Sequence, residues 1–465
     1  MSGKKTAYSG FVRTEEAPLL PPPPSQVGIT GWLWNNIFAS MANFSSPMAA
    51  IQSLLMFLLT VGVLWFGYTQ FYALLDFALF SAVFSDPETT KRLSCATVKQ
   101  GGELDAEWYG ACWPFIIAKT KFLIYGKYPM EALWRVDLVF ASGAIGLGWV
   151  LWEGAAYRKY VGAFMLTIWP VIAFILLTGG GIEVSAGFWL TGITIILVFF
   201  GLGWLGSRGI GGEPLAAVSG MITLVGMIYS GFLAAVFFSS LDYGMEKVDT
   251  SDWGGLLVTL VVAVTGIVAS LPLGIILALG RRSQMPVARM ISTVFIEFWR
   301  GVPLITVLFM ASVMLPLFLP EGVDFDKLLR ALIGVALFSA AYMAEVVRGG
   351  LQAMPRGQYE GAEALGLPYW KTMRLIILPQ ALTHVIPGIV NTFIGLFKDT
   401  TLVLIIGIYD FLGAIQASLS DANWSTPVQG QSGYLAAAII YWIFCFSMSR
   451  YSVFMERKLR RGHER

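Results

Sequence analysis

The feature that most limits how this chain can fold is a series of apolar segments, each long enough to cross a lipid bilayer. A membrane-spanning helix needs about 20 consecutive, mostly apolar residues. Such segments lie near residues 50–72, 136–153, 161–179, 186–206, 216–238, 255–280, 302–320, 328–347, 383–408 and 433–451. Segment 73–85 is also apolar and is expected to prolong the first helix or to lie at the membrane interface. The sequence therefore predicts an all-α polytopic membrane protein with about ten transmembrane helices.

The composition excludes an ordinary soluble domain. Apolar residues make up 56% of the chain and charged residues only 13%, and the mean hydropathy is +0.69. A formal net charge of +2 is too small to indicate a nucleic-acid partner. Residues 1–30 contain lysines, an arginine and a run of four prolines but no apolar core, so they are not a cleavable signal peptide. We expect residues 1–48 to form a flexible cytoplasmic tail.

The charged residues between the spans fall into two alternating sets. The basic set comprises Arg158, Lys159, Arg208, Arg281, Arg282, Arg289, Arg356, Lys371, Arg374, Arg457, Lys458, Arg460 and Arg461. The acidic set comprises Asp242, Glu246, Asp249, Asp252, Glu321, Asp324, Asp326, Asp410 and Asp421. Basic loops remain on the cytoplasmic side of a membrane. The pattern predicts that both termini and the loop around residue 360 face the cytoplasm.

A polar island interrupts the apolar spans at residues 354–380. Its sequence predicts two short helices separated by a glycine, because Pro355 suits the first turn of a helix and Gly366 suits its end. Pro368 is expected to begin the second helix and Pro379 to end it. The apolar face of the second helix is expected to consist of Trp370, Met373 and Ile377. In a chain this apolar, such an island indicates a docking surface for a soluble partner.

The island also resembles the motif of a known family. Glu360-Gly361-Ala362, then Gly366, then Ile376-x-Leu378-Pro379 resembles the "EAA…G…I.LP" loop of ATP-binding-cassette (ABC) importer permeases, with glycine as the second motif residue. The stretches that resemble the amino-acid importer branch of this family are Arg300–Leu304, Ala344–Gly350, Leu378–Ala381 and Lys398–Thr401. The resemblance covers about residues 251–465, and the long N-terminal extension makes the chain similar to general L-amino-acid permease subunits.

This resemblance implies a function and a set of partners. It implies that residues 251–465 form a core of five helices in the permease subunit of an ATP-driven L-amino-acid importer of the bacterial inner membrane. It also implies a second permease subunit, two cytoplasmic ATPase subunits bound at residues 354–380, and a periplasmic amino-acid-binding protein. The residues that it assigns to ATPase coupling are Glu360, Gly361, Ala362, Gly366, Leu378 and Pro379.

The sequence offers no chemistry that would make the chain itself an enzyme. It contains no G-x-x-x-x-G-K-[ST] phosphate loop, and the glycine-rich stretch 206–212 is expected to be a tight turn. Two histidines, His384 and His463, and three scattered cysteines give little support for a metal site. We therefore expect no cofactor in this chain, and ATP with Mg²⁺ on a partner ATPase.

Several polar residues within the last spans are candidates for the substrate path, because ionisable groups at membrane depth are costly. Lys398 and Asp399 could meet the carboxylate and ammonium of an amino acid, or could form ion pairs that only hold the helices together. Glu345 could bind an amine or gate the path, or could simply pair with Arg348. Asn391 could contact substrate or only mark a loosened helix.

The region before the core is expected to be a transmembrane extension, residues 49–250, with a long outer loop at 86–135. Cys95 and Cys112 lie in this loop, where an oxidising compartment would favour a disulfide, although two cysteines can also share a loop by chance. The loop is expected to have few other contacts that hold its shape. Cys445 is expected to remain a free, buried thiol in the last span.

Two other classes of function are alternatives to an ABC permease. An ion-gradient-driven secondary transporter would be expected to carry paired internal repeats and intramembrane carboxylates in both halves, and neither is evident in the sequence. A membrane sensor or scaffold would use the docking island only to recruit a partner. An ATPase bound through residues 354–380 and required for uptake would distinguish the permease from both.

Overall fold

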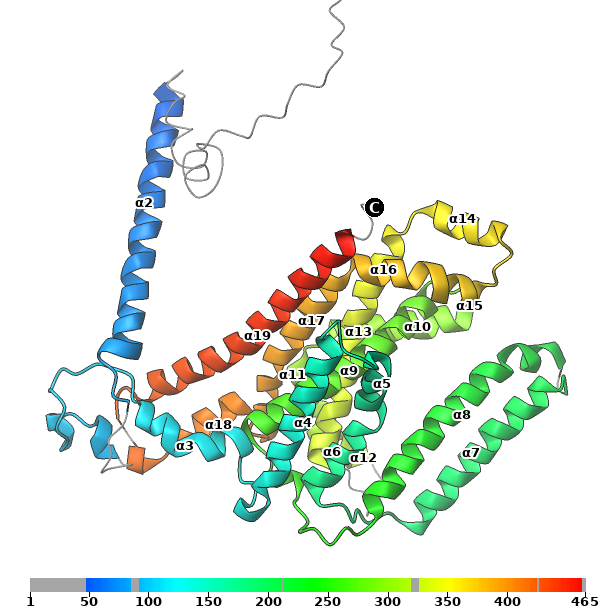
Figure 1. Ribbon diagram of the computed structural model, residues 1–465, viewed down its shortest axis with the longest axis horizontal. Coiled ribbons are helices and arrows are strands. Elements are labelled where there is room, and N and C mark those ends of the chain that lie inside the picture. The colour runs from blue at the N-terminus through cyan, green and yellow to red at the C-terminus, as the bar shows by residue number, and fades with distance from the viewer. Residues whose placement is uncertain (1–46, 85–91, 211, 319–325, 425, 462–465) are drawn as a thin grey trace, which may run out of the picture. The chain divides into compact units, whose positions relative to one another are not determined.

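The computed structural model describes residues 47–84, 92–210, 212–318, 326–424 and 426–461, and all of its named elements are helices (Figure 1). Within these ranges, seven helices are long and apolar enough to cross a membrane, or up to nine if each of two bent pairs is one span. The predicted span 216–238 lies in α8 (Gly212–Ser240). The all-α polytopic architecture is thus confirmed, and the expected number of about ten spans is roughly consistent with it. The predicted tail, residues 1–48, lies almost wholly outside the described residues.

The chain divides into two compact units, residues 1–82 and 83–465. In the first unit, α2 (Pro47–Leu75) continues directly into a π-helical turn at Asp76–Phe80. This turn explains the apolar residues after position 72, which prolong the first helix. The predicted division of the chain at residues 48 and 250 stays a prediction.

The second unit begins with the rest of the extension. Its long helices are α4 (Leu133–Leu151), α5 (Arg158–Thr167), α6 (Trp169–Thr178), α7 (Ala186–Ser207) and α8. The predicted span 161–179 is bent by 42° between α5 and α6, where Pro170 occupies the first turn of α6. In Figure 1, α7 and α8 lie side by side as a hairpin.

The core follows α8. Its helices are α9 (Gly255–Arg281), α10 (Pro286–Gly301), α11 (Leu304–Phe309), α12 (Leu315–Phe318), α13 (Lys327–Ala353), α17 (Ile386–Asp399), α18 (Phe411–Ser418) and α19 (Gln429–Arg461). The chain turns by 101° between α10 and α11–α12, at Gly301-Val302-Pro303. Helices α9 and α13 pack closely, because a Cβ at Gly274 would lie only 2.7 Å from Met343 Cγ.

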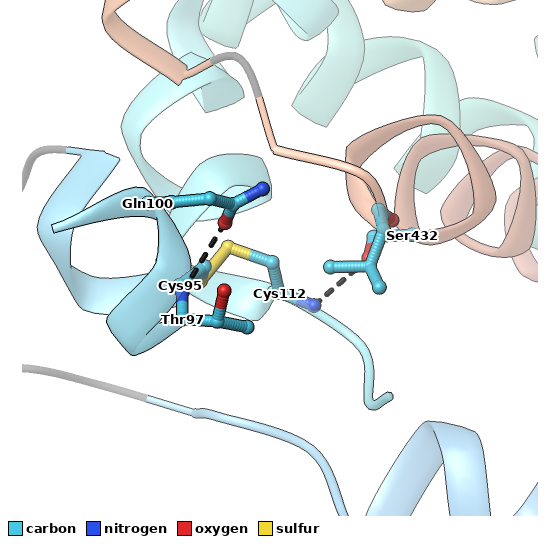
Figure 2. The surroundings of a disulfide bond; sticks show 6 residues. Cys95, Thr97, Gln100, Cys112 and Ser432 are labelled. Atoms are coloured by element: carbon cyan, nitrogen blue, oxygen red, sulfur yellow. Dashed lines mark hydrogen bonds between the residues drawn. A yellow bond between two sulfur atoms is a disulfide. The ribbon is translucent and has the colours of Figure 1, made fainter. Parts of the chain in front are cut away.

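The outer loop forms a cap that includes α3 (Trp113–Tyr125). Cys95 and Cys112 are joined by a disulfide, with their Cα atoms 5.9 Å apart, and the Cys112 N–H donates a 2.8 Å hydrogen bond to Ser432 Oγ of α19 (Figure 2). The expectation that few other contacts hold this loop is therefore wrong. Apolar residues of the loop pack against the core, as the contact of Phe115 with Trp424 shows.

Contacts between loops show which loops lie together at each end of the second unit. Among the segments predicted to lie outside, the Lys127 N–H bonds Asp252 O at 3.0 Å, and the Thr250 hydroxyl donates to Asp326. Among those predicted to lie inside, Lys458 forms an ion pair with Glu153. Segments assigned to one side thus contact one another. We refer below to the outer end and the inner end in this sense.

Candidate functional site

The polar island forms a helix, a glycine turn and a second helix at the inner end. Helix α14 (Arg356–Ala364) begins after Pro355 and ends at Ala364, with Leu365 as its C-terminal cap. Gly366 then adopts a φ of +68°, which a residue with a side chain rarely adopts, and the Leu367 N–H bonds Ala362 O at 3.1 Å. Figure 1 shows α14 projecting from the end of the core. The predicted helix–glycine–helix is confirmed.

The second helix differs from the prediction in two ways. It begins with α15 (Tyr369–Thr372), but Pro379 does not end it, because a π-helical turn at Met373–Ile377 leads without a break into α16 (Leu378–His384). The widened turn alters the usual hydrogen-bond pattern before Pro379, which has no N–H to donate. Met373 and Ile377 are buried, whereas Trp370, which is expected on the same face, is 66% exposed.

Residues 354–380, which we call the docking loop, are firmly attached to the core beneath them. Met373 and Ile377 pack in one apolar cluster with Met343 and Leu351 of α13. Arg282, just after α9, donates a 2.7 Å hydrogen bond to Leu351 O and places its guanidinium 5.9 Å from the ring of Tyr359 in α14. Displacement of α14 by a partner would therefore be transmitted to α9 and α13.

The outward surface of this loop suits a protein partner. Glu360, Gly361 and Gly366 are exposed, and a Cβ added at Gly361 would meet no atom within 4 Å. Leu365 and Trp370 expose 76% and 66% of their surface, an unusual apolar exposure for a loop predicted to lie outside lipid.

Two of the remaining coupling candidates are less accessible. Ala362 is only 1% exposed, so its side chain faces the core rather than the surface of α14, and its role in coupling stays a prediction. Leu378 is partly buried, whereas its neighbour Pro379 is exposed.

Glu345 is the centre of a charge network close to the docking loop. Its Oε1 accepts a 2.7 Å hydrogen bond from Arg281 Nη1 at the end of α9. Its Oε2 accepts bonds of 2.9 and 2.6 Å from Arg348 and lies 3.8 Å from Arg300 of α10. Arg281 also bonds Glu297 of α10 at 2.7 Å. The pairing of Glu345 with Arg348 is thus one part of a network that joins three helices.

The other path candidates lie apart from this network. Lys398 and Asp399 end α17, and neither has an ion pair within 4.0 Å among the residues that the structure describes. Asn391 is exposed on the same helix. Within the described ranges, no hydrogen bond or ion pair joins Glu345 to any of these three residues. The described residues also contain no group of three or more His, Cys, Asp or Glu placed to hold a metal ion; His463 lies outside them.

Sequence reasoning missed the role of Asp410. Its carboxylate is fully buried, caps α18 by accepting the N–H groups of Leu412 and Gly413, and accepts a 3.0 Å bond from the Tyr441 hydroxyl of α19. Burial raises the pKa of Asp410 above its ordinary value, and these hydrogen bonds oppose the rise. An aspartate directly before an apolar run is a helix N-cap signal that could have identified it.

The fold and the site together define a class of protein: a polytopic membrane protein whose core carries an exposed helix–glycine–helix at one end. Residues 270–461 match the family described as "Binding-protein-dependent transport system inner membrane component". The matched residues include most of the core and the whole of the polar island.

Two relatives extend the match over most of the chain. It is 41% identical to the inner membrane amino-acid ABC transporter permease protein YhdY of Escherichia coli (strain K12), over 93% of both chains. It is also 41% identical to the glutamate/glutamine/aspartate/asparagine transport system permease protein BztC of Rhodobacter capsulatus, over 98% of this chain and 99% of the relative. The chain belongs to the family of amino-acid ABC transporter permeases.

A solved structure described as the crystal structure of an amino acid ABC transporter with histidines is 28% identical to this chain. The match covers 44% of this chain and 92% of the chain in that structure, with a TM-score of 0.39.

Proposed function

We propose that this permease works with a second permease subunit, a dimeric cytoplasmic ATPase and a periplasmic amino-acid-binding protein. The observation that carries the proposal is the exposed docking loop, whose buried face is fixed to α9 and α13. ATP and Mg²⁺ act on the ATPase, and this chain holds neither. The docking loop and both termini face the cytoplasm, as the basic inner loops favour.

The cargo is an L-amino acid, and acidic amino acids and their amides are the first candidates. The name of one relative that aligns over 98% of this chain specifies these four compounds. Lys398, Asp399 and Asn391 of α17 are proposed to line the path, since the two charged groups have no ion pair among the described residues. Glu345 is proposed instead to act in coupling, because its carboxylate is occupied by arginines.

Transport follows from differential nucleotide binding by the ATPase. When its subunits close on ATP, α14 is displaced, and the contacts of Arg282 and of the apolar cluster carry this movement into α9 and α13. The core then changes from outward to inward access, as a population shift between two packed states.

A substitution at Gly361 tests this function. Gly361→Trp places an indole on the exposed face of α14 without a clash inside the chain, since an added Cβ meets no atom within 4 Å. We expect liposomes that contain the variant with the ATPase and binding protein to lose at least tenfold in ATP-driven uptake of labelled glutamine, and to lose ATPase co-purification.

The matched control is Gly154→Trp, in the exposed loop between α4 and α5. There a new Cβ meets nothing closer than 3.6 Å, and uptake is expected to stay at the parental level. Normal uptake by the Gly361 variant would contradict docking through α14. Uptake that follows an ion gradient without any ATPase would establish a secondary transporter instead.

A further inference from the structure

A pocket of about 460 Å³ opens at the outer end, where the extension meets the core. Four segments line it, at residues 122–127, 249–254, 326–330 and 407–409. The first belongs to the extension and the second to its junction with the core, whereas the third and fourth belong to the core. The pocket is therefore a joint product of both regions.

The walls of this outer pocket are fixed in place by backbone contacts. The Gly255 N–H bonds Tyr409 O at 2.8 Å, and the Lys127 N–H bonds Asp252 O at 3.0 Å. A Cβ at Gly126, whose φ is +69°, would lie only 2.5 Å from Gly254 Cα. The two segments can therefore lie this close together only because position 126 is a glycine. Contacts within the chain thus fix the shape of the pocket, as is common for small-molecule sites.

Its charged groups suit a molecule with one positive and one negative end. Lys127 of the extension and Lys327 of α13 both line the pocket, and neither ammonium has an ion pair within 4.0 Å among the described residues. A Cβ at Gly407 would lie 3.4 Å from Lys327 Nζ, which places that ammonium over the turn at residues 407–409.

Asp249 supplies the opposite charge. Its Oδ1 accepts the Ser251 N–H at 2.8 Å, and this hydrogen bonding to Ser251 keeps the pKa of Asp249 below its ordinary value, so the group is a carboxylate at neutral pH. The second carboxylate of the pocket, Asp326, is already used, because it caps α13 and accepts the Thr250 hydroxyl.

A further feature of the wall is a buried hydrogen-bond donor without an acceptor. Trp253 is one of the lining residues and is 5% exposed, and its indole N–H has no acceptor among the described residues. A buried donor without an acceptor is costly and calls for a group that the protein does not itself supply.

We propose that the outer pocket binds a free zwitterionic α-amino acid. The ligand's carboxylate lies between Lys127 and Lys327, and its ammonium is held by Asp249. The inference rests on the proposed function only in taking an amino acid as cargo. It gives the extension a role, because Lys127 completes a binding site at the outer end of two core segments.

Equilibrium binding to the purified full-length chain in nanodiscs, without ATPase or binding protein, tests the site. We expect labelled glutamine to bind, and neither its decarboxylated amine nor its deaminated acid to compete, because each lacks one charge. Lys127→Ala and Asp249→Asn should each weaken binding about tenfold or more, as expected for a lost charge-assisted hydrogen bond. The matched controls Lys99→Ala and Asp105→Asn change exposed residues of the cap and should leave affinity unchanged.

The outcomes separate this site from the proposed function. If the complete transporter imports amino acids but neither Lys127→Ala nor Asp249→Asn changes binding to the isolated chain, the pocket proposal fails and the function stands. If both variants instead weaken only the affinity for the binding protein, the pocket is a protein contact and the proposal is again wrong. If the complete transporter moves no amino acid, the proposed function fails.

Discussion

The two ends of α13 use their charged groups in opposite ways. At the inner end, three arginines surround Glu345. Its carboxylate oxygens accept hydrogen bonds from two of them and lie within 4.0 Å of the third. At the outer end, Lys327 lies in an open pocket and has no ion pair among the described residues. One helix therefore carries a satisfied network at one end and an unsatisfied one at the other.

This difference separates mechanical from binding roles. Charges that neutralise one another hold α9, α10 and α13 together, so these helices are expected to move as a group when the docking loop moves. Charges without a partner leave interaction energy that a ligand can use. Three substitutions test this difference: one at the inner end, one between the two ends, and one in the outer cap.

The largest effect is expected from Glu345→Gln. Removing the central carboxylate of a partly buried ion network leaves the surrounding arginines without their partner, at a cost of about 2 kcal/mol in the free energy of unfolding. Thermal unfolding in detergent should show this loss, and amide exchange should show faster opening of α14 and the end of α9. Glu363→Gln, on the exposed face of α14, is the control and should change neither. An unchanged melting temperature for the Glu345 variant would mean that the network does not hold the inner end together.

A smaller effect is expected between the two ends, at Asp399. Asp399→Asn removes a carboxylate that has no ion pair among the described residues, so complex assembly should persist. If the group contacts cargo, uptake of labelled amino acid should fall about tenfold, equivalent to about 1.4 kcal/mol in the transport barrier. A variant that assembles and transports like the parent would remove Asp399 from the path. Failed assembly would assign it a structural role.

The smallest effect is expected at the outer cap, where Lys119 of α3 pairs with Asp421. The hydrogen bond from Lys119 lowers the pKa of Asp421 from its ordinary value of 3.8. A carboxyl whose pKa is lowered by folding adds stability above pH 3.8, and that stability is lost as the pH falls through the folded-state pKa.

Asp421→Asn should therefore destabilise the protein by about 0.5 kcal/mol at pH 7, as expected for a pair near the surface, and the difference from the parent should vanish well below pH 3.8. Melting curves at both pH values would measure this. Asp105→Asn should have no effect at either pH. A constant difference across this range would show that the stabilisation does not come from the charge of Asp421.

The features that the sequence predicted well depend on local information. The boundaries of α14 follow from Pro355 and Gly366, whose backbone preferences need no tertiary contact. The membrane spans follow from composition over about 20 residues. The continuation of helix through Pro379 was not predictable in this way, because a π-helical turn is chosen by the packing of Met373 and Ile377 beneath it.

The candidate site shows the same limit at longer range. The sequence identified Arg348 as a partner of Glu345 because the two are one helical turn apart, but Arg281 lies 64 residues away on another helix. The outer pocket combines segments from before and within the core, so no single stretch of sequence indicated it. The apolar contact of Phe115 with Trp424 similarly joins a cap and a core that look separate in the sequence.

The continuity of α13 has a geometric consequence. The helix runs for 27 residues with no internal proline, from the outer pocket to the docking loop. At about 1.5 Å per residue it is about 40 Å long, so a tilt of about 5° about one end moves the other by about 3.5 Å. That displacement is about the size of a water molecule. A small rotation imposed at the docking loop would thus be enough to open or close a passage of solvent width on the opposite side of the bilayer.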